Sequence, residues 1–259
     1  CFWWWKTRPP PRHIFITGAS SGIGRALALA YASDGVRLSL SGRNEARLNE
    51  TARLCRDKGA TVSLFLFDVT DEVAARHAIT QANTFQPLDL IIANAGISAG
   101  SFGHGESETT ARAIFDTNIR CVLNTVCPAL DIFKSTGGQI AIVSSIAGVT
   151  PLAGCPAYSA TKACVRFWGQ ALNARFSPKI RVSVICPGFI KTPLTDANDF
   201  PMPFMMPADK AAKIIVNGLI KNKPLITFPF MTALGARLLA LLPNGLQLPI
   251  IKKMPRKES

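Results

Sequence analysis

The chain has 259 residues, which is long enough for one large domain that folds around its own core without disulfides or a metal. Hydrophobic residues make up 48% of the sequence and charged residues only 17%, which excludes an intrinsically disordered chain. The formal net charge of +13 favours anionic partners, which are nucleic acid, anionic lipid or a small phosphorylated ligand.

From residue 13 onward, short apolar runs alternate with segments of helical periodicity. The apolar runs predict strands buried on both faces, at residues 13–17, 37–41, 61–67, 88–93, 139–144 and 181–186. The periodic segments predict helices at residues 22–34, 44–58, 71–83, 109–134 and 156–176. This alternation implies right-handed crossovers and a doubly wound parallel sheet, so we expect a single α/β domain. After residue 186 we expect loops and an apolar helix.

The sequence TGASSGIG, residues 17–24, joins the first predicted strand to the first predicted helix. Glycine allows a tight turn and a close approach of phosphate, and a helix N-terminus offers free N–H groups to a pyrophosphate. An ordinary tight turn is the alternative, but the position directly after the first strand favours a dinucleotide site. The cofactor contacts predicted here are Gly18, Ser20, Ser21, Gly22, Ile23 and Gly24.

The second predicted strand ends without the acidic residue that would bind the ribose 2′-hydroxyl of NAD. Arg43 follows it and offers a planar set of donors suited to a 2′-phosphate, which predicts NADP(H) as the cofactor over NAD(H). The alternative is a solvated arginine that opens a helix.

Two further strand ends carry candidate cofactor residues. Asp68 and Val69 follow the third strand, where Asp68 can accept from the adenine amino group or share an N-cap role with Asp71. Asn94, Ala95 and Gly96 follow the fourth strand, where small residues let a cofactor lie against the sheet edge.

Three residues form the strongest predicted site. Ser145 follows the fifth strand, and Tyr158 and Lys162 share one face of the next helix at spacing i, i+4. An ammonium near a phenol favours the phenolate and lowers its pKa, which makes Tyr158 a workable proton shuttle near neutral pH. Ser145 can donate a hydrogen bond to a substrate oxygen.

The motifs TGASSGIG, ANAG, SSIAG, YSATK and PGFIKT resemble the short-chain dehydrogenase/reductase family, in its compact single-domain branch, over about residues 14–227. The resemblance implies a Rossmann-type fold and an oxidoreductase that transfers a hydride between a nicotinamide and a carbonyl or secondary alcohol. It implies that Tyr158 is the general acid of reduction, that Lys162 holds the ribose, and that Ser145 orients the carbonyl. It also implies that Asn118 supports a proton-relay water.

The same resemblance places Pro187, Gly188, Ile190 and Thr192 beside the nicotinamide and pyrophosphate. One departure is Ala93, where the family commonly has asparagine, which affects only strand stabilisation. We expect a basic, aromatic segment over residues 1–12, a catalytic dinucleotide-binding domain over 13–228, and an apolar helix with a basic tail over 229–259.

Two other functions are open. A cofactor-binding sensor or scaffold without turnover would be expected to lack one of the four catalytic residues, and all four are present. A nucleotide-sugar epimerase or dehydratase of related fold would space its glycines differently and carry a larger C-terminal domain.

The seven cysteines show no C-x-x-C pair, which indicates free thiols in a reducing compartment and a cytoplasmic protein. His13, His77 and His104 are scattered, so we expect no metal. Basic and aromatic residues do not cluster in the body of the chain, so we expect no nucleic-acid partner.

The substrate is expected to be lipophilic, because residues 199–206 are rich in Met and Phe and lie where such enzymes close over substrate. Packing of these residues on the core or on a partner subunit is the alternative. We expect a homo-oligomer, a dimer or a tetramer.

Residues 230–242, FMTALGARLLALL, predict a helix that is apolar almost all round and too short to cross a bilayer. Pro243 and Pro249 are expected to end any continuation. The basic stretch from Lys252 to Lys257 can meet anionic headgroups, which predicts peripheral membrane contact. A dimer-interface helix and an intramolecular lid are alternatives. The tryptophans beside Lys6 suit a bilayer interface, the trimmed end of a longer anchor, or packing on the domain.

Overall fold

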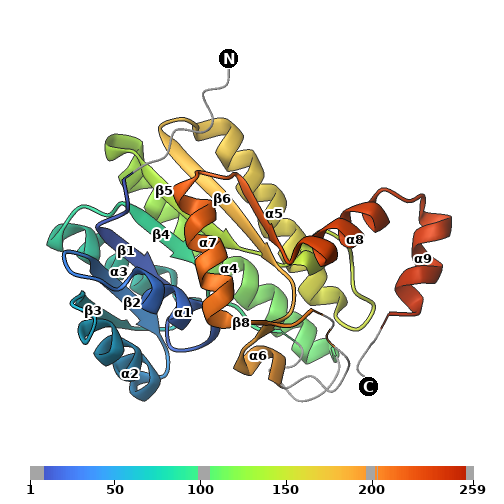
Figure 1. Cartoon of the computed structure of the whole chain (residues 1–259), viewed down its shortest axis with the longest axis horizontal. Coiled ribbons are helices and arrows are strands. Elements are labelled where there is room, and N and C mark those ends of the chain that lie inside the picture. The colour runs from blue at the N-terminus through green and yellow to red at the C-terminus, as the bar shows by residue number, and fades with distance from the viewer. Residues whose placement is uncertain (1–8, 99–105, 197–201, 203, 255–259) are drawn as a thin grey trace.

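The computed structural model describes residues 9–98, 106–196, 202 and 204–254. Seven parallel strands form the main sheet in the order β3-β2-β1-β4-β5-β6-β9 (Figure 1). They are β1 (His13–Ile16), β2 (Arg37–Gly42), β3 (Thr61–Leu66), β4 (Leu90–Ala93), β5 (Gly138–Val143), β6 (Ile180–Pro187) and β9 (Leu225–Phe228). All six predicted strands are present, within two residues at each end. The seventh, β9, was not predicted, because it has only four residues and is flanked by Pro224 and Pro229, which favour loop in the sequence.

Helices cover both faces of this sheet (Figure 1). The helices α1 (Gly22–Tyr31), α2 (Glu45–Arg56) and α7 (Ala208–Ile220) enclose one buried apolar cluster, and α3 (Glu72–Phe85), α4 (Glu108–Thr136) and α5 (Pro156–Phe176) enclose the other. The predicted doubly wound α/β domain of the Rossmann type is therefore confirmed. The helix α7 corrects the expectation of loop after residue 186. Its buried face, with Ala211, Ala212 and Ile215, packs beside α1.

The strand order reverses between β1 and β4, and this reversal sets where a ligand can bind. From β1 the chain continues outward through β2 and β3, and then crosses back to β4 on the other side. Connections that diverge in this way leave a crevice at the carboxyl ends of the strands, where ligands of such sheets bind.

Side-chain capping differs between α1 and the next helices. Asn44, Asp71 and Ser107 each accept a hydrogen bond from a first-turn N–H group of α2, α3 and α4. Ser21 precedes α1 and makes no such bond. The first N–H groups of α1, next to the glycine-rich turn, therefore have no side-chain acceptor at the N-cap.

The last two helices, α8 (Phe230–Ala240) and α9 (Asn244–Lys252), lie apart from the sheet at one side of the molecule (Figure 1). Pro243 lies after the end of α8, as the sequence predicts, and it is also the N-cap residue of α9. Pro249 lies inside α9, which corrects the expectation that it ends the helix. The proline removes one N–H···O=C bond, and the exposed carbonyl of Gly245 can be solvated instead.

Within the described ranges, no helix is both long and apolar enough to cross a membrane. Several residues named in the sequence analysis lie outside these ranges. They are residues 1–8, with the tryptophans and Lys6, together with His104, residues 199–201, Pro203 and residues 255–257.

Candidate active site

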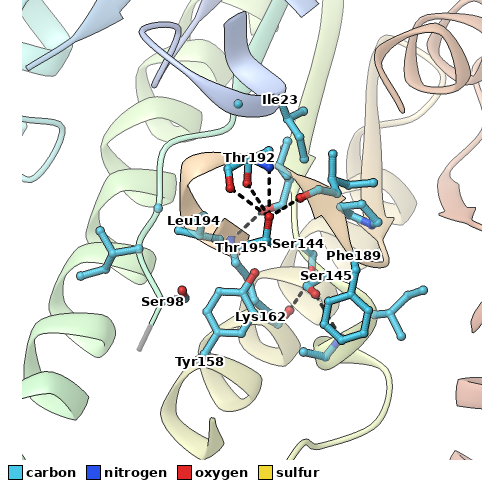
Figure 2. Close-up of a pocket in the computed structure, with 18 of the residues that line it drawn as sticks. Ile23, Ser98, Ser144, Ser145, Tyr158, Lys162, Phe189, Thr192, Leu194 and Thr195 are labelled. Carbon is cyan, nitrogen blue, oxygen red and sulfur yellow. Dashed lines mark hydrogen bonds between the residues drawn. The ribbon is translucent and has the colours of Figure 1, made fainter. Parts of the chain in front are cut away.

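A cavity of about 1140 Å³ lies over the carboxyl ends of the central strands. Every cofactor-binding and catalytic residue predicted from the sequence lines it, except Gly24 and Asn118. In Figure 2, Tyr158, Lys162 and Ser145 lie together at one side of this space, and Ile23 and Thr192 lie at the other. The fold therefore brings together motifs that are separated by more than a hundred residues in the chain.

The glycine-rich turn takes a shape that only glycine accommodates easily. Gly18 and Gly22 have φ values of 68° and 55°, which side chains disfavour. A Cβ atom at Gly24 would collide with the carbonyl oxygen of Gly18, so Gly24 lets α1 pack against the turn and does not line the cavity. The side-chain amide of Asn94 donates to the carbonyl oxygens of Thr17 and Gly18, at 2.9 and 3.2 Å, and holds the turn to β4.

This turn fits a dinucleotide pyrophosphate. A Cβ atom at Gly22 would lie 3.2 Å from Cγ2 of Thr192, so any side chain there would narrow the space between the turn and the segment that carries Thr192 after β6. The N–H groups at the start of α1 lie beside the same space and can donate to phosphate oxygens. Gly18, Gly22 and the start of α1 are thus the residues suited to hold the phosphates.

The N–H group of Thr192 donates to Oγ1 of Thr195 at 3.0 Å, and Oγ1 of Thr195 donates to the carbonyl oxygen of Ile190 at 2.7 Å (Figure 2). Thr195, at the end of α6 (Pro193–Asp196), therefore fixes the segment that carries Thr192. Thr195 was not among the site residues predicted from the sequence. A threonine three residues after Thr192 is the signal that could have found it.

Lys162 lies on α5 one turn after Tyr158, as the i, i+4 spacing requires. Its Nζ atom donates to the carbonyl oxygen of Val143 at 3.0 Å and lies 5.6 Å from the centre of the Tyr158 ring. The hydroxyl of Ser144 donates to the carbonyl oxygen of Lys162 at 2.7 Å, and that of Ser145 accepts from the N–H of Ala147 at 3.1 Å. Both ends of the lysine are therefore fixed to the end of β5.

Burial raises the pKa of Tyr158 to about 12, and interaction with the Ser145 side chain offsets only part of this increase. Burial likewise lowers the pKa of Lys162. The sequence predicted that Lys162 lowers the tyrosine pKa, but in this structure the loss of hydration dominates and the group that lowers the pKa is Ser145. The Tyr158 hydroxyl is therefore protonated at neutral pH, which is the form that a general acid of reduction needs.

Asn118 lies behind the cavity wall. Its Nδ2 atom donates to the carbonyl oxygen of Ile97 at 3.0 Å and to Oγ1 of Thr161 at 3.2 Å, and its Oδ1 atom accepts from the N–H of Ile97 at 2.8 Å. The side chain is almost fully buried and connects α4, α5 and the segment after β4.

Arg43 and Asp68, from the ends of β2 and β3, form an ion pair of 3.3 Å with both side chains substantially exposed. Partial burial raises the pKa of Asp68, but hydrogen bonds from Thr70 and the charge of Arg43 outweigh it and lower the pKa. Asp71 is the N-cap of α3, so the alternative that Asp68 shares this role does not hold. Arg47, in the first turn of α2, lines the same cavity and was missed, because Arg43 lies before the helix and the two arginines therefore share no helical spacing.

Glu106 is a second residue that sequence reasoning missed. Its carboxylate accepts from the N–H groups of Ala157 at 2.6 Å and Tyr158 at 3.0 Å, at the start of α5. Cys155, the N-cap residue, makes no side-chain hydrogen bond there. A carboxylate at a helix N-terminus stabilises the free N–H groups and the positive end of the dipole. The contact spans 51 residues of sequence, so no local pattern could have revealed it.

We expect Glu106→Gln to lower the free energy of unfolding by about 1–2 kcal/mol and to reduce kcat, because the amide group faces a backbone N–H that has lost its acceptor. Denaturant unfolding and steady-state kinetics measure both effects. Glu50→Gln is the matched control, since Glu50 is exposed in the middle of α2 and pairs with Arg53 on its own helix. Equal behaviour of the two variants would contradict the assigned role of Glu106.

The end of the cavity beyond Tyr158 is apolar. Its walls include Leu152, Phe189 and Leu194, and four leucines of the C-terminal region, which are Leu238, Leu239, Leu241 and Leu242. The described members of the Met- and Phe-rich segment do not line the cavity, which corrects the expectation for them. Met206 is buried in β8 (Met206–Pro207), paired with β7 (Ile190–Lys191), and Phe204 and Met205 are exposed.

Among the residues that the structure describes, no three His, Cys, Asp or Glu side chains lie close enough to hold a metal ion. The six described cysteines are free thiols.

The sequence model of the short chain dehydrogenase family matches residues 12–200, and the chain belongs to this family. An uncharacterized oxidoreductase of Myxococcus xanthus is 35% identical over 91% of this chain and 94% of its own length. The 11-beta-hydroxysteroid dehydrogenase 1A of Arabidopsis thaliana is 30% identical over 83% of this chain and 68% of its own. A short-chain dehydrogenase from Sphingobium yanoikuyae, solved in complex with NADPH, is 25% identical, covers 95% of this chain and 97% of its own, and has a TM-score of 0.76.

Membership in this family and the Rossmann-type fold together define the protein as an oxidoreductase. It acts on CH–OH or C=O groups of small molecules and binds a nicotinamide dinucleotide.

Proposed function

We propose that this protein is an NADPH-dependent reductase of lipophilic carbonyl compounds, which also oxidises the corresponding secondary alcohols. The observation that supports this most is the single cavity that runs from Arg43 through Tyr158 to the leucines of the C-terminal region. One end is cationic and suits a phosphorylated cofactor, and the other end is apolar and suits the substrate.

In the proposed mechanism, the Tyr158 hydroxyl donates its proton to the carbonyl oxygen as that oxygen gains negative charge. The Ser145 hydroxyl donates a hydrogen bond to the same oxygen and orients it. The bound dinucleotide supplies the hydride that reduces the carbonyl carbon. Lys162, held by the carbonyl oxygen of Val143, would bind the ribose hydroxyls, and Asn118 would support the water that returns a proton to Tyr158.

The proposed preference for NADPH is based on the positive charge that follows the end of β2. Arg43 and Arg47 both line the cavity, and no acidic residue occupies the position that would bind a ribose 2′-hydroxyl. The guanidinium of Arg43 can form charge-assisted hydrogen bonds to a 2′-phosphate.

The proposal of a lipophilic substrate is based on the apolar end of the cavity, where leucines outnumber the two threonines that line it, Thr150 and Thr232. The name of the Arabidopsis relative, a hydroxysteroid dehydrogenase, is in line with this class. We propose further that the protein is a cytoplasmic homo-oligomer.

The test is NADPH oxidation with matched pairs of ketones and aldehydes that differ only in apolar size. We expect kcat/KM to rise with apolar size and small polar ketones to react poorly. A panel in which small polar ketones are the better substrates would overturn the substrate class. NADPH binding without oxidation of any substrate would favour the alternative, a cofactor-binding sensor or scaffold.

A further inference from the structure

The outer face of α8 carries large apolar side chains in contact with solvent. Phe230, Met231, Leu234, Leu238 and Leu241 are all exposed, and their spacing of three or four residues places them along one side of the helix. Only Ala233 and Leu239 of this helix are buried. The larger apolar groups thus face outward, which is the reverse of an ordinary surface helix.

The helix α9 continues this apolar surface. Leu246, Leu248 and Ile250 are exposed, and only Ile251 is buried. Figure 1 shows both helices at one side of the molecule, where no other labelled element covers them. Exposed apolar side chains gathered on adjoining elements indicate a surface that binds a partner.

The charged side chains of the C-terminal region itself are of one sign. Lys252 and Lys253 are exposed at the end of α9, and no Asp or Glu occurs from Lys210 to Lys257 in the sequence. Apolar side chains beside exposed lysines match the two layers of an anionic lipid surface. A second copy of the chain fits less well, because a two-fold contact would bring the lysines of both copies together without an acidic partner.

The apolar surface is continuous with the active-site cavity. Leu238, Leu241 and Ile250 are exposed on one side and line the cavity on the other. The cavity that contains Tyr158 therefore borders this surface.

We propose that the docking face, defined as the exposed apolar residues of α8 and α9 with Lys252 and Lys253, binds peripherally to anionic lipid. The leucines enter the boundary between headgroups and acyl chains, and the lysines contact the headgroups. A lipophilic substrate can then pass from the lipid into the cavity. This passage of substrate rests on the proposed function, whereas the binding to lipid does not.

The experiment is flotation of the full chain with vesicles of phosphatidylcholine alone or mixed with phosphatidylserine. We expect the protein to float with the anionic vesicles at low salt, to float less at high salt, and to remain unbound with phosphatidylcholine alone. Leu246→Glu should raise the lipid concentration for half-binding by at least about tenfold, because a charge is costly at the acyl boundary. Val73→Glu, at an exposed apolar residue of α3, is the matched control and should bind normally.

A second pair of variants tests the charges. Reversal of Lys252 and Lys253 to Glu should weaken binding to anionic vesicles, because these lysines contact the headgroups. The same reversal at exposed Lys210 and Lys213 of α7 changes the net charge equally and should weaken binding far less. Equal weakening would show that net charge, and not the docking face, controls binding.

Three further results would overturn the proposal. The first is that the protein does not float with anionic vesicles at low salt. The second is that Leu246→Glu and the Lys252/Lys253 variant float as the wild type does. The third is that sedimentation shows a dimer which Leu246→Glu dissociates, while lipid has no effect. Leu246 does not line the cavity, so reduction of a water-soluble ketone without vesicles should be unchanged in Leu246→Glu. That assay separates failure of lipid binding from failure of the proposed reaction.

Discussion

Tyr158→Phe is expected to lower kcat for carbonyl reduction by at least about 1000-fold while the dissociation constant for NADPH stays nearly unchanged. Phenylalanine keeps the ring that packs beside Lys162 and removes only the hydroxyl that donates the proton. Burial keeps that hydroxyl protonated at neutral pH, with a pKa of about 12, so the wild-type residue holds the proton that the variant lacks. Single-turnover kinetics and fluorescence titration with NADPH measure the two quantities.

The chain contains its own control for this substitution. Tyr31 is the second of its two tyrosines, and its hydroxyl is buried without a hydrogen-bond partner among the described residues. Tyr31→Phe should therefore leave kcat unchanged and should not destabilise the protein. A Tyr158→Phe variant that kept more than about a tenth of the wild-type kcat would refute the acid role of this residue.

Arg43→Ala is expected to raise KM for NADPH by about 10- to 100-fold and KM for NADH by much less. A hydrogen bond to a charged group contributes about 1.5–3 kcal/mol, and only NADPH has the 2′-phosphate that accepts it. The substitution also leaves the Asp68 carboxylate without its arginine partner, and that carboxylate repels the phosphate. Steady-state kinetics with both cofactors, at fixed substrate, measures the ratio.

Arg53→Ala is the control for the loss of a positive charge from the same region. Arg53 lies on α2, pairs with Glu50 and Asp57, and does not line the cavity. It should change neither KM. Equal increases in both KM values for Arg43→Ala would show that this arginine supports the fold of the site and does not distinguish the cofactors.

Much of the fold and of the cofactor end of the site follows from local sequence. Strands buried on both faces need continuous apolar runs, and a turn with positive φ needs glycine, so β1 to β6 and the residues around Gly18 and Gly22 can be read from short segments. Tyr158 and Lys162 share a face because they are one helical turn apart. In each case the physical cause acts within a few neighbouring residues.

Other features depend on which segments meet in the folded chain. The helix α7 is stabilised by α1 and the strand β9 by β6, and Glu106 reaches α5 across 51 residues. The pKa of Tyr158 was predicted in the wrong direction, because the sequence reveals a nearby lysine but not the loss of hydration around the hydroxyl.

The apolar end of the cavity was predicted on residues 199–206, but the walls that the structure describes there come largely from the C-terminal leucines. The sequence shows that both segments are apolar. Which of them reaches the cavity is decided by the path of the chain after β9, because α8 begins directly after the carboxyl end of this strand, at the side of the sheet where the cavity lies. Apolar composition is a property of a segment, whereas contact with a cavity is a property of the packed molecule, and only the tertiary structure determines the second.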